Sequence, residues 1–205
     1  KKYGIENTTT DTNSLFENED INTIVIATRH NTHARFVIKG LEAGKHVFVE
    51  KPLCLNLDEM AQIEKAYQNN IDKGAPTLLM VGYNRRFAPQ VRKMSELLMS
   101  VKLPKALIMT VNAGHIPVEH WTQDPLIGGG RIIGEACHFI DLLGFLADSP
   151  VFSWRLTPMK APLRDTVTID LQFTNGSIGS VHYFSNGSKE LPKERLEVFS
   201  EGRVL

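Results

Sequence analysis

Residues 23–52 read TIVIATRHNTHARFVIKGLEAGKHVFVEKP and contain a strand, a helix and a second strand in succession. Residues 23–27 are apolar at successive positions, which is typical of a strand covered on both faces of a parallel sheet. A helix from about residue 34 to residue 43 follows, and Gly44 can supply the left-handed residue that ends it. The second strand covers residues 45–49 and stops before a proline, which cannot donate to a sheet. This stretch predicts a parallel α/β layer.

The same alternation of strands and helices continues toward the C-terminus. Asn56 and Glu59 form the pattern of a helix start, a capping side chain followed three residues later by a carboxylate. That helix extends to about Gln68, residues 77–81 form a third buried strand, and residues 89–100 form another helix. Because parallel strands need crossover connections, the pattern predicts a partial Rossmann-type parallel layer over residues 1–82.

The second half of the chain has a different hydrophobic period. Apolar and polar residues alternate over residues 107–111 and again over residues 166–173, which indicates antiparallel strands with one apolar face. The pairs at 175–176 and 186–187 are both Asn-Gly and read as hairpin turns. Residues 196–199 are the last predicted strand. We therefore expect residues 83–205 to form an α+β domain with a large, mostly antiparallel sheet.

Composition limits the function classes. The 205 residues have 23 basic and 23 acidic side chains, so the formal net charge is zero. A balanced charge argues against nucleic acid or an anionic membrane as the partner. No apolar run is long enough to cross a bilayer, and the opening Lys1-Lys2-Tyr3-Gly4 has no signal-peptide pattern. Two cysteines are too few for a disulfide framework, so a cytoplasmic location is expected.

The predicted helix at 134–147, GEACHFIDLLGFLA, is apolar almost all round and is therefore expected to be buried. Glu135, His138 and Asp141 nevertheless recur every three residues, on one side of it. Polar groups on a buried helix must be paired or must line a cavity. The row is thus either a satisfied polar network in the core or part of a functional site.

Three segments are specific enough to suggest a family. The first is residues 24–33 together with AGKHVFVEKP at 43–52, and the second is GYNRRF at 82–87. The third is GGG at 128–130 followed by GEACHFID at 134–141. In this order they resemble the Gfo/Idh/MocA family of NAD(P)-dependent oxidoreductases. The resemblance implies a Rossmann domain followed by an α/β domain with a large, mostly antiparallel sheet.

The sequence departs from the family pattern in two places. It contains no G-x-G-x-x-G turn, which in the family follows the first Rossmann strand and holds the pyrophosphate. We therefore expect a fragment that lacks the first βαβ unit, is truncated at both ends, and is inactive in isolation. Gly134 stands where many members have an aspartate four residues before the histidine. The form GEACHFID is similar to a subgroup fused behind a medium-chain dehydrogenase-like domain.

The resemblance implies catalytic roles for Lys51, His138 and Glu135. Oxidising an alcohol needs a base near the hydroxyl and positive charge near the developing alkoxide. Lys51, in the Glu-Lys-Pro motif, would polarise the oxygen or relay the proton, and His138 would be the general acid/base. Glu135 would orient His138 or contact substrate hydroxyls. Without the family pattern, Lys51 reads as a solvated loop residue and His138 as a paired core histidine.

Binding residues are implied in the same way. Those for the cofactor, NAD or NADP, are Thr28, Asn31, His33, Glu50, Lys51, Pro52, Asn84 and Arg85. Those for the substrate are Trp121, Glu135 and Asp141. Alternatives are that His33 caps a helix, Arg86 is a surface cation, Trp121 packs in a core and Asp141 fixes geometry. No metal is expected, because no zinc-ligand spacing is present.

The implied activity is hydride transfer to or from a hydroxyl-bearing carbon of a sugar or cyclitol. Two alternatives remain: an NAD-assisted glycosidase or lyase of the same fold, and a non-catalytic regulatory or assembly domain. The implied partners are a small sugar or cyclitol and further copies of the chain, associated through the face of the sheet.

Overall fold

The computed structural model describes residues 4–161 and 164–205, so the opening Lys1-Lys2-Tyr3 lies outside the described residues. The chain divides into two compact parts, Lys1–Gly82 and Tyr83–Leu205, called unit 1 and unit 2 below. Unit 1 contains a parallel sheet with helices, and unit 2 contains a mixed, mostly antiparallel sheet with helices. The predicted α/β fold class is confirmed.

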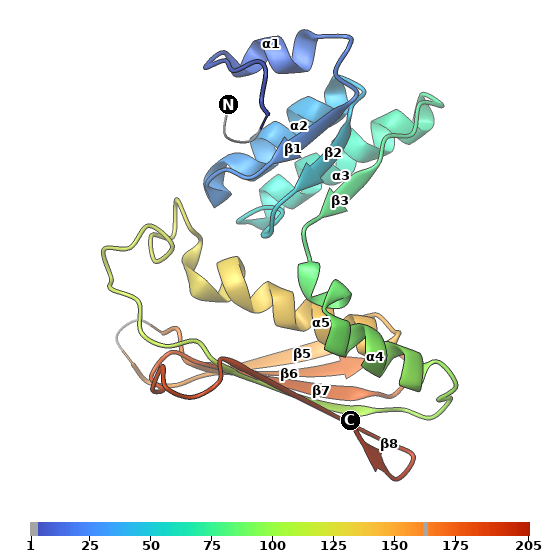
Figure 1. Cartoon of the computed structure of the whole chain (residues 1–205), viewed down its shortest axis with the longest axis vertical. Helices are drawn as coiled ribbons and strands as arrows, with labels where there is room; N and C mark the ends of the chain where they lie inside the picture. The colour runs from blue at the N-terminus through green and yellow to red at the C-terminus, as the bar shows by residue number, and fades with distance from the viewer. Residues whose placement is uncertain (1–3, 162–163) are drawn as a thin grey trace. The chain divides into compact units, whose positions relative to one another are not determined.

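Unit 1 is a small strand–helix–strand layer (Figure 1). Its three strands are parallel and adjacent in chain order: β1 (Thr23–Ile26), β2 (His46–Val49) and β3 (Leu79–Val81). The connections are η1 (His30–Thr32) with α2 (His33–Glu42), and α3 (Leu57–Asp72). As predicted, Asn56 caps α3 by accepting the Glu59 N–H at 2.9 Å, and Gly44 has a φ of +69° beyond α2.

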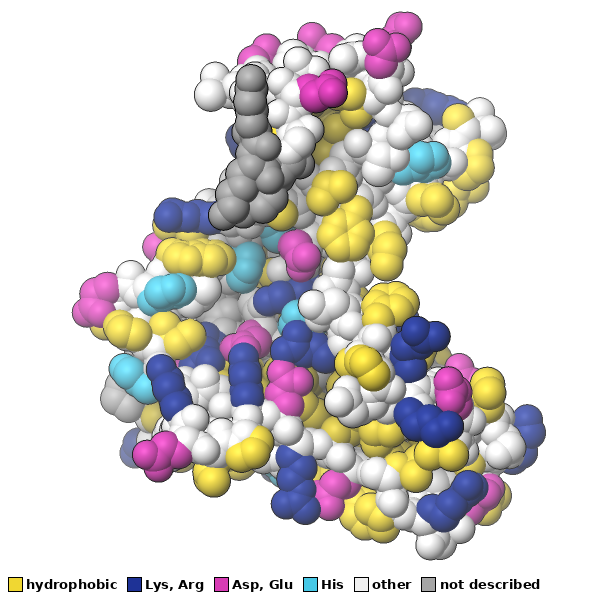
Figure 2. Space-filling model, in the orientation of Figure 1, with side chains coloured by type: hydrophobic (Ala, Val, Ile, Leu, Met, Phe, Trp, Pro, Cys, Tyr) yellow, Lys and Arg dark blue, Asp and Glu magenta, His cyan; other side chains and the backbone are white. Residues whose placement is uncertain are grey.

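Helices α2 and α3 cover only one face of this sheet (Figure 1). Ile26, Val47 and Val49 are at most 3% exposed and pack against both helices. On the other face Val25, Phe48 and Met80 are register partners, and Val25 is 68% exposed. We call these three residues the open face; Figure 2 shows exposed hydrophobic side chains on this sheet.

The prediction that these strands are covered on both faces is therefore wrong for the described residues. The physical reason lies in the strand order. Crossovers in α/β layers are right-handed, and here β1, β2 and β3 follow one another in a single direction across the sheet. Both helices must then lie on the same side. An apolar run shows that a strand prefers burial, but it does not show that helices cover both sides.

A short helix that the sequence does not predict precedes β1. This helix, α1 (Thr12–Glu17), is capped at its start by Asp11, whose side chain accepts the Asn13 N–H at 2.9 Å. Phe16 is 6% exposed and stacks on Phe36 of α2 at 6.1 Å between centroids. A helix of six residues is too short to show the 3.6-residue period.

Unit 2 is a six-stranded sheet with α4 (Pro89–Leu98) and α5 (Cys137–Ala147) on one face (Figure 1). Its strands are β4 (Ala106–Asn112), β5 (Val151–Pro158), β6 (Val167–Phe173), β7 (Ile178–Phe184), β8 (Glu194–Ser200) and β9 (Arg203–Val204). They lie in the order β5-β6-β7-β4-β8-β9. The predicted alternation is confirmed, because Val167, Ile169, Leu171 and Phe173 are all at most 3% exposed.

The strand pairing differs from the prediction in one region. The Asn175-Gly176 turn joins the antiparallel strands β6 and β7, as predicted. However, β7 pairs in parallel with β4, and β8 pairs with the other side of β4. Asn186-Gly187 therefore begins a longer loop and is not a hairpin turn. The sheet is mixed because β4, the first strand of unit 2 in the sequence, lies between β7, with which it is parallel, and β8, with which it is antiparallel.

The helix predicted at 134–147 begins differently from an α-helix. Its first part is a π-helix, η3 (Ile132–Ala136), and α5 follows. The predicted burial is confirmed, since Phe139 and Leu143 of α5 are 0% exposed. Short π-helical segments occur frequently at functional sites. Within the described part of the chain, none of the helices has the length and apolar character needed to cross a bilayer.

Candidate functional site

The loops that follow β1 and β2 lie at the carboxyl ends of parallel strands, where open α/β sheets bind ligands. The loops start side by side, because the Glu50 N–H donates to the Ile26 carbonyl at 2.9 Å. Five of the cofactor residues implied for unit 1 share this edge: Thr28, Asn31, Glu50, Lys51 and Pro52. Thr28 and Asn31 are exposed, whereas Glu50 and Lys51 are half-buried. The Lys51–Pro52 peptide bond is cis.

His33 lies beneath these loops and is 0% exposed. Its Nδ1 is 2.7 Å from the Pro52 carbonyl oxygen, and its Nε2 is 3.1 Å from the Thr28 carbonyl oxygen. The helix-capping interpretation is wrong, since the ring is bonded to two carbonyls and makes no cap at the start of α2. The ring also has no exposed surface with which to touch a cofactor directly.

In unit 2, His138 lies in the first turn of α5 and is 4% exposed. Its ring contacts Tyr83 edge-on, with 6.1 Å between centroids and 74° between planes. The ring of Phe139 lies 6.4 Å away. A histidine held between aromatic rings at a helix start has a fixed orientation, which suits a group that exchanges a proton with a bound substrate.

Glu135, in the π-helix, accepts hydrogen bonds from three side chains. Lys193 donates to Oε1 at 2.5 Å, Arg131 donates to Oε2 at 3.2 Å, and Tyr183 donates to the same oxygen. Tyr183 lies on β7, and Lys193 directly precedes β8. We call these four residues the Glu135 network. It ties the helix that carries His138 to the sheet.

The network holds Glu135 in its ionised form. Burial raises the pKa of this carboxyl, but the hydrogen bonds from Lys193 and Tyr183 outweigh burial, and the pKa falls to about 2. Burial and then the bond to this carboxylate raise the pKa of the Tyr183 phenol. Near neutral pH, Glu135 therefore stays charged and Tyr183 stays protonated. A group so far from its titration range is a poor general acid or base.

Arg131, Tyr183 and Lys193 are residues that the sequence analysis missed. The Arg131 side chain is 2% exposed, and it also donates to the main-chain carbonyls of Gly114 and Ala113 at 2.5 and 3.1 Å. Two signals were present in the sequence. Arg131 precedes Glu135 by four residues, the spacing of a helical ion pair. Tyr183 occupies an inward position of an alternating strand, where a buried hydroxyl needs a partner.

Asp141 does not pair with His138 but with Arg86. The Arg86 guanidinium makes two hydrogen bonds to this carboxylate, one of them from Nε at 2.7 Å. The hydrogen bond to Asp141 raises the pKa of Arg86. The interpretation of Arg86 as a simple surface cation is therefore wrong, because its guanidinium is paired with Asp141.

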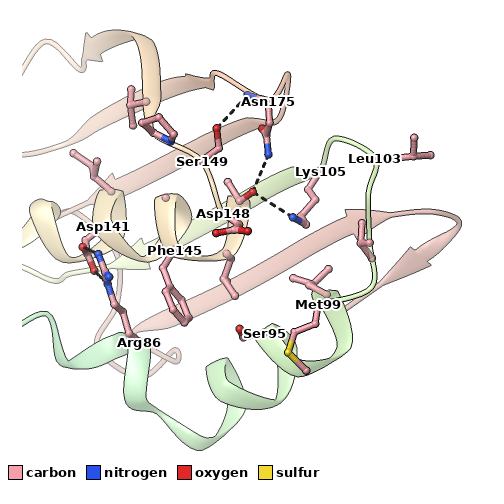
Figure 3. A pocket seen from close by; sticks show the side chains of 18 of the residues that line it. Arg86, Ser95, Met99, Leu103, Lys105, Asp141, Phe145, Asp148, Ser149 and Asn175 are labelled. Atoms are coloured by element: carbon pink, nitrogen blue, oxygen red, sulfur yellow. Dashed lines mark hydrogen bonds and ion pairs between the residues drawn. The ribbon is translucent and has the colours of Figure 1, made fainter.

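The Arg86–Asp141 pair lies in the wall of a cavity of about 930 Å³ between α4, α5 and the segment that leads into β4 (Figure 3). At the far end of α5, Lys105 donates to the Ala147 carbonyl at 3.2 Å. Asn175 donates to the same carbonyl at 2.9 Å. His138 and Glu135 are not among the described residues that line this cavity.

Asn84 and Arg85, implied as cofactor residues, lie in η2 (Asn84–Phe87) of unit 2. Asn84 is exposed. Arg85 forms an ion pair with Glu194 at 2.5 Å. Glu194 directly follows Lys193, a member of the Glu135 network. Residues 193 and 194 thus bind the two segments next to His138: the π-helix through Glu135, and η2 through Arg85.

Trp121 is half-buried on the loop between β4 and the π-helix. Its main chain packs against Gly128, where an added Cβ would lie 2.6 Å from the Trp121 carbonyl oxygen and 2.4 Å from Thr122 Cα. Only glycine fits so close an approach. Gly128 of the GGG segment therefore packs directly against the Trp121 loop.

Both cysteines, Cys54 and Cys137, are free thiols. Burial, followed by the charge of Glu59, raises the pKa of the Cys54 thiol, so it is a weak nucleophile. Across residues 4–161 and 164–205, no three His, Cys, Asp or Glu side chains come together as metal ligands.

Comparison with known proteins agrees with this geometry. The sequence model of the oxidoreductase family with an NAD-binding Rossmann fold, Gfo/Idh/MocA, matches residues 1–74. A myo-inositol 2-dehydrogenase of Thermotoga maritima is 27% identical over 217 residues, which cover the whole chain and 62% of that protein. A levoglucosan dehydrogenase of Pseudarthrobacter phenanthrenivorans is 26% identical, over 91% of this chain and 55% of that protein.

Solved structures show the same architecture. The crystal structure of a probable dehydrogenase from Thermotoga maritima superposes with a TM-score of 0.82 at 25% identity, over the whole chain and 62% of that protein. A levoglucosan dehydrogenase in complex with NADH and levoglucosan gives 0.79 at 25% identity, over 97% of this chain and 57% of that protein. Residues 1–74 therefore match the Gfo/Idh/MocA family, and the whole chain has the fold of these solved dehydrogenases. The chain spans about three fifths of the length of these relatives.

Proposed function

We propose that the protein is an NAD(P)-dependent dehydrogenase that moves a hydride to or from a hydroxyl-bearing carbon of a sugar or cyclitol. Unit 1 would bind the dinucleotide, and unit 2 would bind the substrate. The observation that carries the proposal is Lys51, half-buried at the carboxyl end of the central strand β2, directly between Glu50 and Pro52. Relatives that act on inositol and on levoglucosan support the substrate class.

The side chains at the edge of unit 1 fit the nicotinamide end of a dinucleotide. The Thr28 hydroxyl and the Asn31 amide are exposed and can donate or accept hydrogen bonds. Glu50 can accept from ribose hydroxyls, and Gly82 leaves room for it, since an added Cβ there would lie 3.0 Å from Glu50 Oε2. When bound, the nicotinamide ring supplies the hydride acceptor or donor.

We propose separate roles for the acid–base side chains. The Lys51 ammonium would stabilise negative charge that develops on the reacting oxygen. His138 would take the hydroxyl proton during oxidation and return it during reduction. Glu135, bound by three donors and ionised near neutral pH, would act as a positioning residue for the helix of His138.

The remaining roles follow from the same placements. Trp121, half-buried on a loop held by Gly128, would contact the substrate ring. Asn84, exposed beside Arg85, would border the cofactor. Asp141, which pairs with Arg86, would help to fix the position of α5, the helix that carries His138.

We further propose that copies of the chain associate through the outer face of the unit 2 sheet. Ile178 is 56% and Phe199 is 39% exposed, and both flank the same residue of β4, Ala106. The same face also carries Asp170 and Gln172, which are exposed. Light scattering of the whole protein tests this proposal: a monomer at micromolar concentration would contradict it.

The test of the activity uses the whole protein with NAD or NADP and a panel of cyclitols and sugars. Absorbance of the reduced nicotinamide should rise, and Lys51→Met and His138→Asn should each lower turnover by about 10²-fold, the size of lost acid–base help. Lys65→Met, an exposed lysine of α3, is the matched control. Substrate conversion without net cofactor reduction would instead identify the lyase or glycosidase alternative.

A further inference from the structure

We infer that His33 is a positioning residue that fixes the Lys51 loop to the loop after β1. The inference rests on the proposed function, because it assigns His33 a task in placing Lys51. It differs from the expectation that His33 touches the cofactor. The side chain is fully buried, and it joins two loops whose other residues form the proposed cofactor edge.

The hydrogen-bond geometry defines this task. Nδ1 faces the Pro52 carbonyl oxygen at 2.7 Å, and Nε2 faces the Thr28 carbonyl oxygen at 3.1 Å. Both ring nitrogens are thus directed at acceptors of the main chain. A neutral imidazole has one N–H and donates to one of these carbonyls at a time, whereas an imidazolium donates to both. In either form both nitrogens face main-chain oxygens, so the ring serves the two loops and not a bound molecule.

Pro52 is the point at which such a contact has most effect on Lys51. Proline has no N–H, so its carbonyl is the one main-chain group through which Pro52 can be hydrogen-bonded. Pro52 is also buried, and Lys51 directly precedes it. Holding this carbonyl limits the movement of the residue that follows Lys51, and small displacements of a positioned group can cost large factors in rate.

Thr28 is the second point of attachment. Its carbonyl oxygen contacts His33, and its hydroxyl bonds to the hydroxyl of Thr32 at 2.6 Å. Thr32 is the residue directly before α2. Because His33 is the first residue of α2, the helix start serves as the common anchor of both loops. We therefore expect the two loops to move together when His33 is replaced.

The experiment compares His33→Leu and His33→Gln with a matched control in the whole protein. Asn70→Leu is the control, because Asn70 is also buried in unit 1 and donates to the Leu41 carbonyl at 2.7 Å, away from these loops. Hydrogen exchange followed by mass spectrometry reports residues 28–32 and 53–55. His33→Leu should raise exchange there by about tenfold, the effect of a lost hydrogen bond, whereas Asn70→Leu should not.

The kinetic readout separates positioning from general destabilisation. In His33→Leu, kcat should fall by about tenfold or more while KM for the cofactor changes by less than about twofold. His33→Gln keeps a donor, so its kcat and its hydrogen exchange should lie between those of the wild type and of His33→Leu. The same measurements on His33→Gln decide the question if His33→Leu does not fold. Equal exchange at residues 53–55 in the His33 variants and in Asn70→Leu would overturn the inference. A whole protein without dehydrogenase activity would refute the proposed function, and the exchange result would still decide the role of His33.

Discussion

Glu135 illustrates how a side chain acquires its chemistry from partners that are distant in the sequence. Its neighbours in space include Tyr183, 48 residues away, and Lys193, 58 residues away. The family pattern drew attention to Glu135 because it lies next to Gly134, the position at which many members have an aspartate. The pattern could not show that three donors already occupy its carboxylate.

The first prediction concerns the charge of this carboxylate. Its pKa is about 2 in the folded protein, below the ordinary value of 4.5, so the unfolded chain binds the proton more readily. The stabilisation is therefore fully present above about pH 4.5 and is lost as the pH falls toward 2. Glu135→Gln should lower the free energy of unfolding at neutral pH. It should also reduce the dependence of that free energy on pH below about 4.5, because up to about one fewer proton is taken up on unfolding.

Denaturant unfolding between pH 2 and pH 7 measures this slope. Glu190→Gln is the control, because Glu190 is exposed and belongs to the same unit. The same slope in the wild type and in Glu135→Gln would show that the network does not hold the charge of Glu135.

The sequence identified some site residues better than others, for a physical reason. Lys51 and His138 lie in contiguous motifs, so local spacing was sufficient to select them. Arg131, Tyr183 and Lys193 act through contacts across the sheet, which no local spacing encodes. His33 was expected on a loop but is the buried first residue of α2, and its burial depends on how two separate loops meet.

Among the elements, α5 depends on how closely it can approach β7. Gly179 lies on the inner face of that strand, and an added Cβ would lie 3.0 Å from Leu143 Cδ1 and 3.3 Å from Phe173 Cε2. The absence of a side chain at this position lets the helix that carries His138 pack against the sheet. A glycine inside a strand often marks such a close approach.

The second prediction tests this approach. Gly179→Val should lower the free energy of unfolding by about 1–3 kcal/mol, the usual cost of overpacking a core. Ser180→Thr, on the opposite face of β7, also adds a β-branched side chain and keeps the hydroxyl that bonds Asp170, so it should be nearly neutral. Denaturant unfolding measures both; a neutral Gly179→Val would show that α5 can shift without cost.

Elements with a strong local signal were predicted well. The cap of α3 and the Asn175-Gly176 turn depend on neighbouring residues alone. The edge strand β5 was not predicted, although Phe152, Trp154 and Leu156 alternate with polar residues along it. In the structure this alternation does not separate a buried face from an exposed one, because nearly all residues of β5 are exposed. The π-helix was not predicted either, since its sequence fits an ordinary helix and only its main-chain hydrogen bonds distinguish it.

At the scale of the whole molecule, the sequence indicated the two layers but not the strand order of the second. Alternation shows which side of a strand is buried, but it does not show which strand lies beside it. The parallel pairing of β4 with β7 joins residues far apart in the chain, so it follows from the packing of the complete sheet.

The third prediction concerns the open face of unit 1. Val25 is 68% and Met80 is 48% exposed, so replacing them by polar residues removes apolar surface that water already contacts. In the 205-residue chain, Val25→Thr with Met80→Gln should weaken binding of a hydrophobic dye and change the free energy of unfolding by less than about 0.5 kcal/mol.

Val47→Thr is the control for this prediction, because Val47 is 2% exposed on the covered face. It should destabilise the chain by about 1–3 kcal/mol, since its hydroxyl would be buried without a partner. If the exposed-face variant loses as much stability as Val47→Thr, the open face is covered in solution.

The central place of β4 has a consequence for the order in which the chain is synthesised. Residues 106–112 leave the ribosome long before residues 178–184 and 194–200, the strands that border them on either side. The β5–β6–β7 portion can pair locally as it emerges, but the two edges of β4 must wait for residues 178–184 and 194–200. Loop closure over such separations is slow. During translation, β4 therefore remains an apolar segment with two unpaired edges, the stage at which a chaperone would have most to protect.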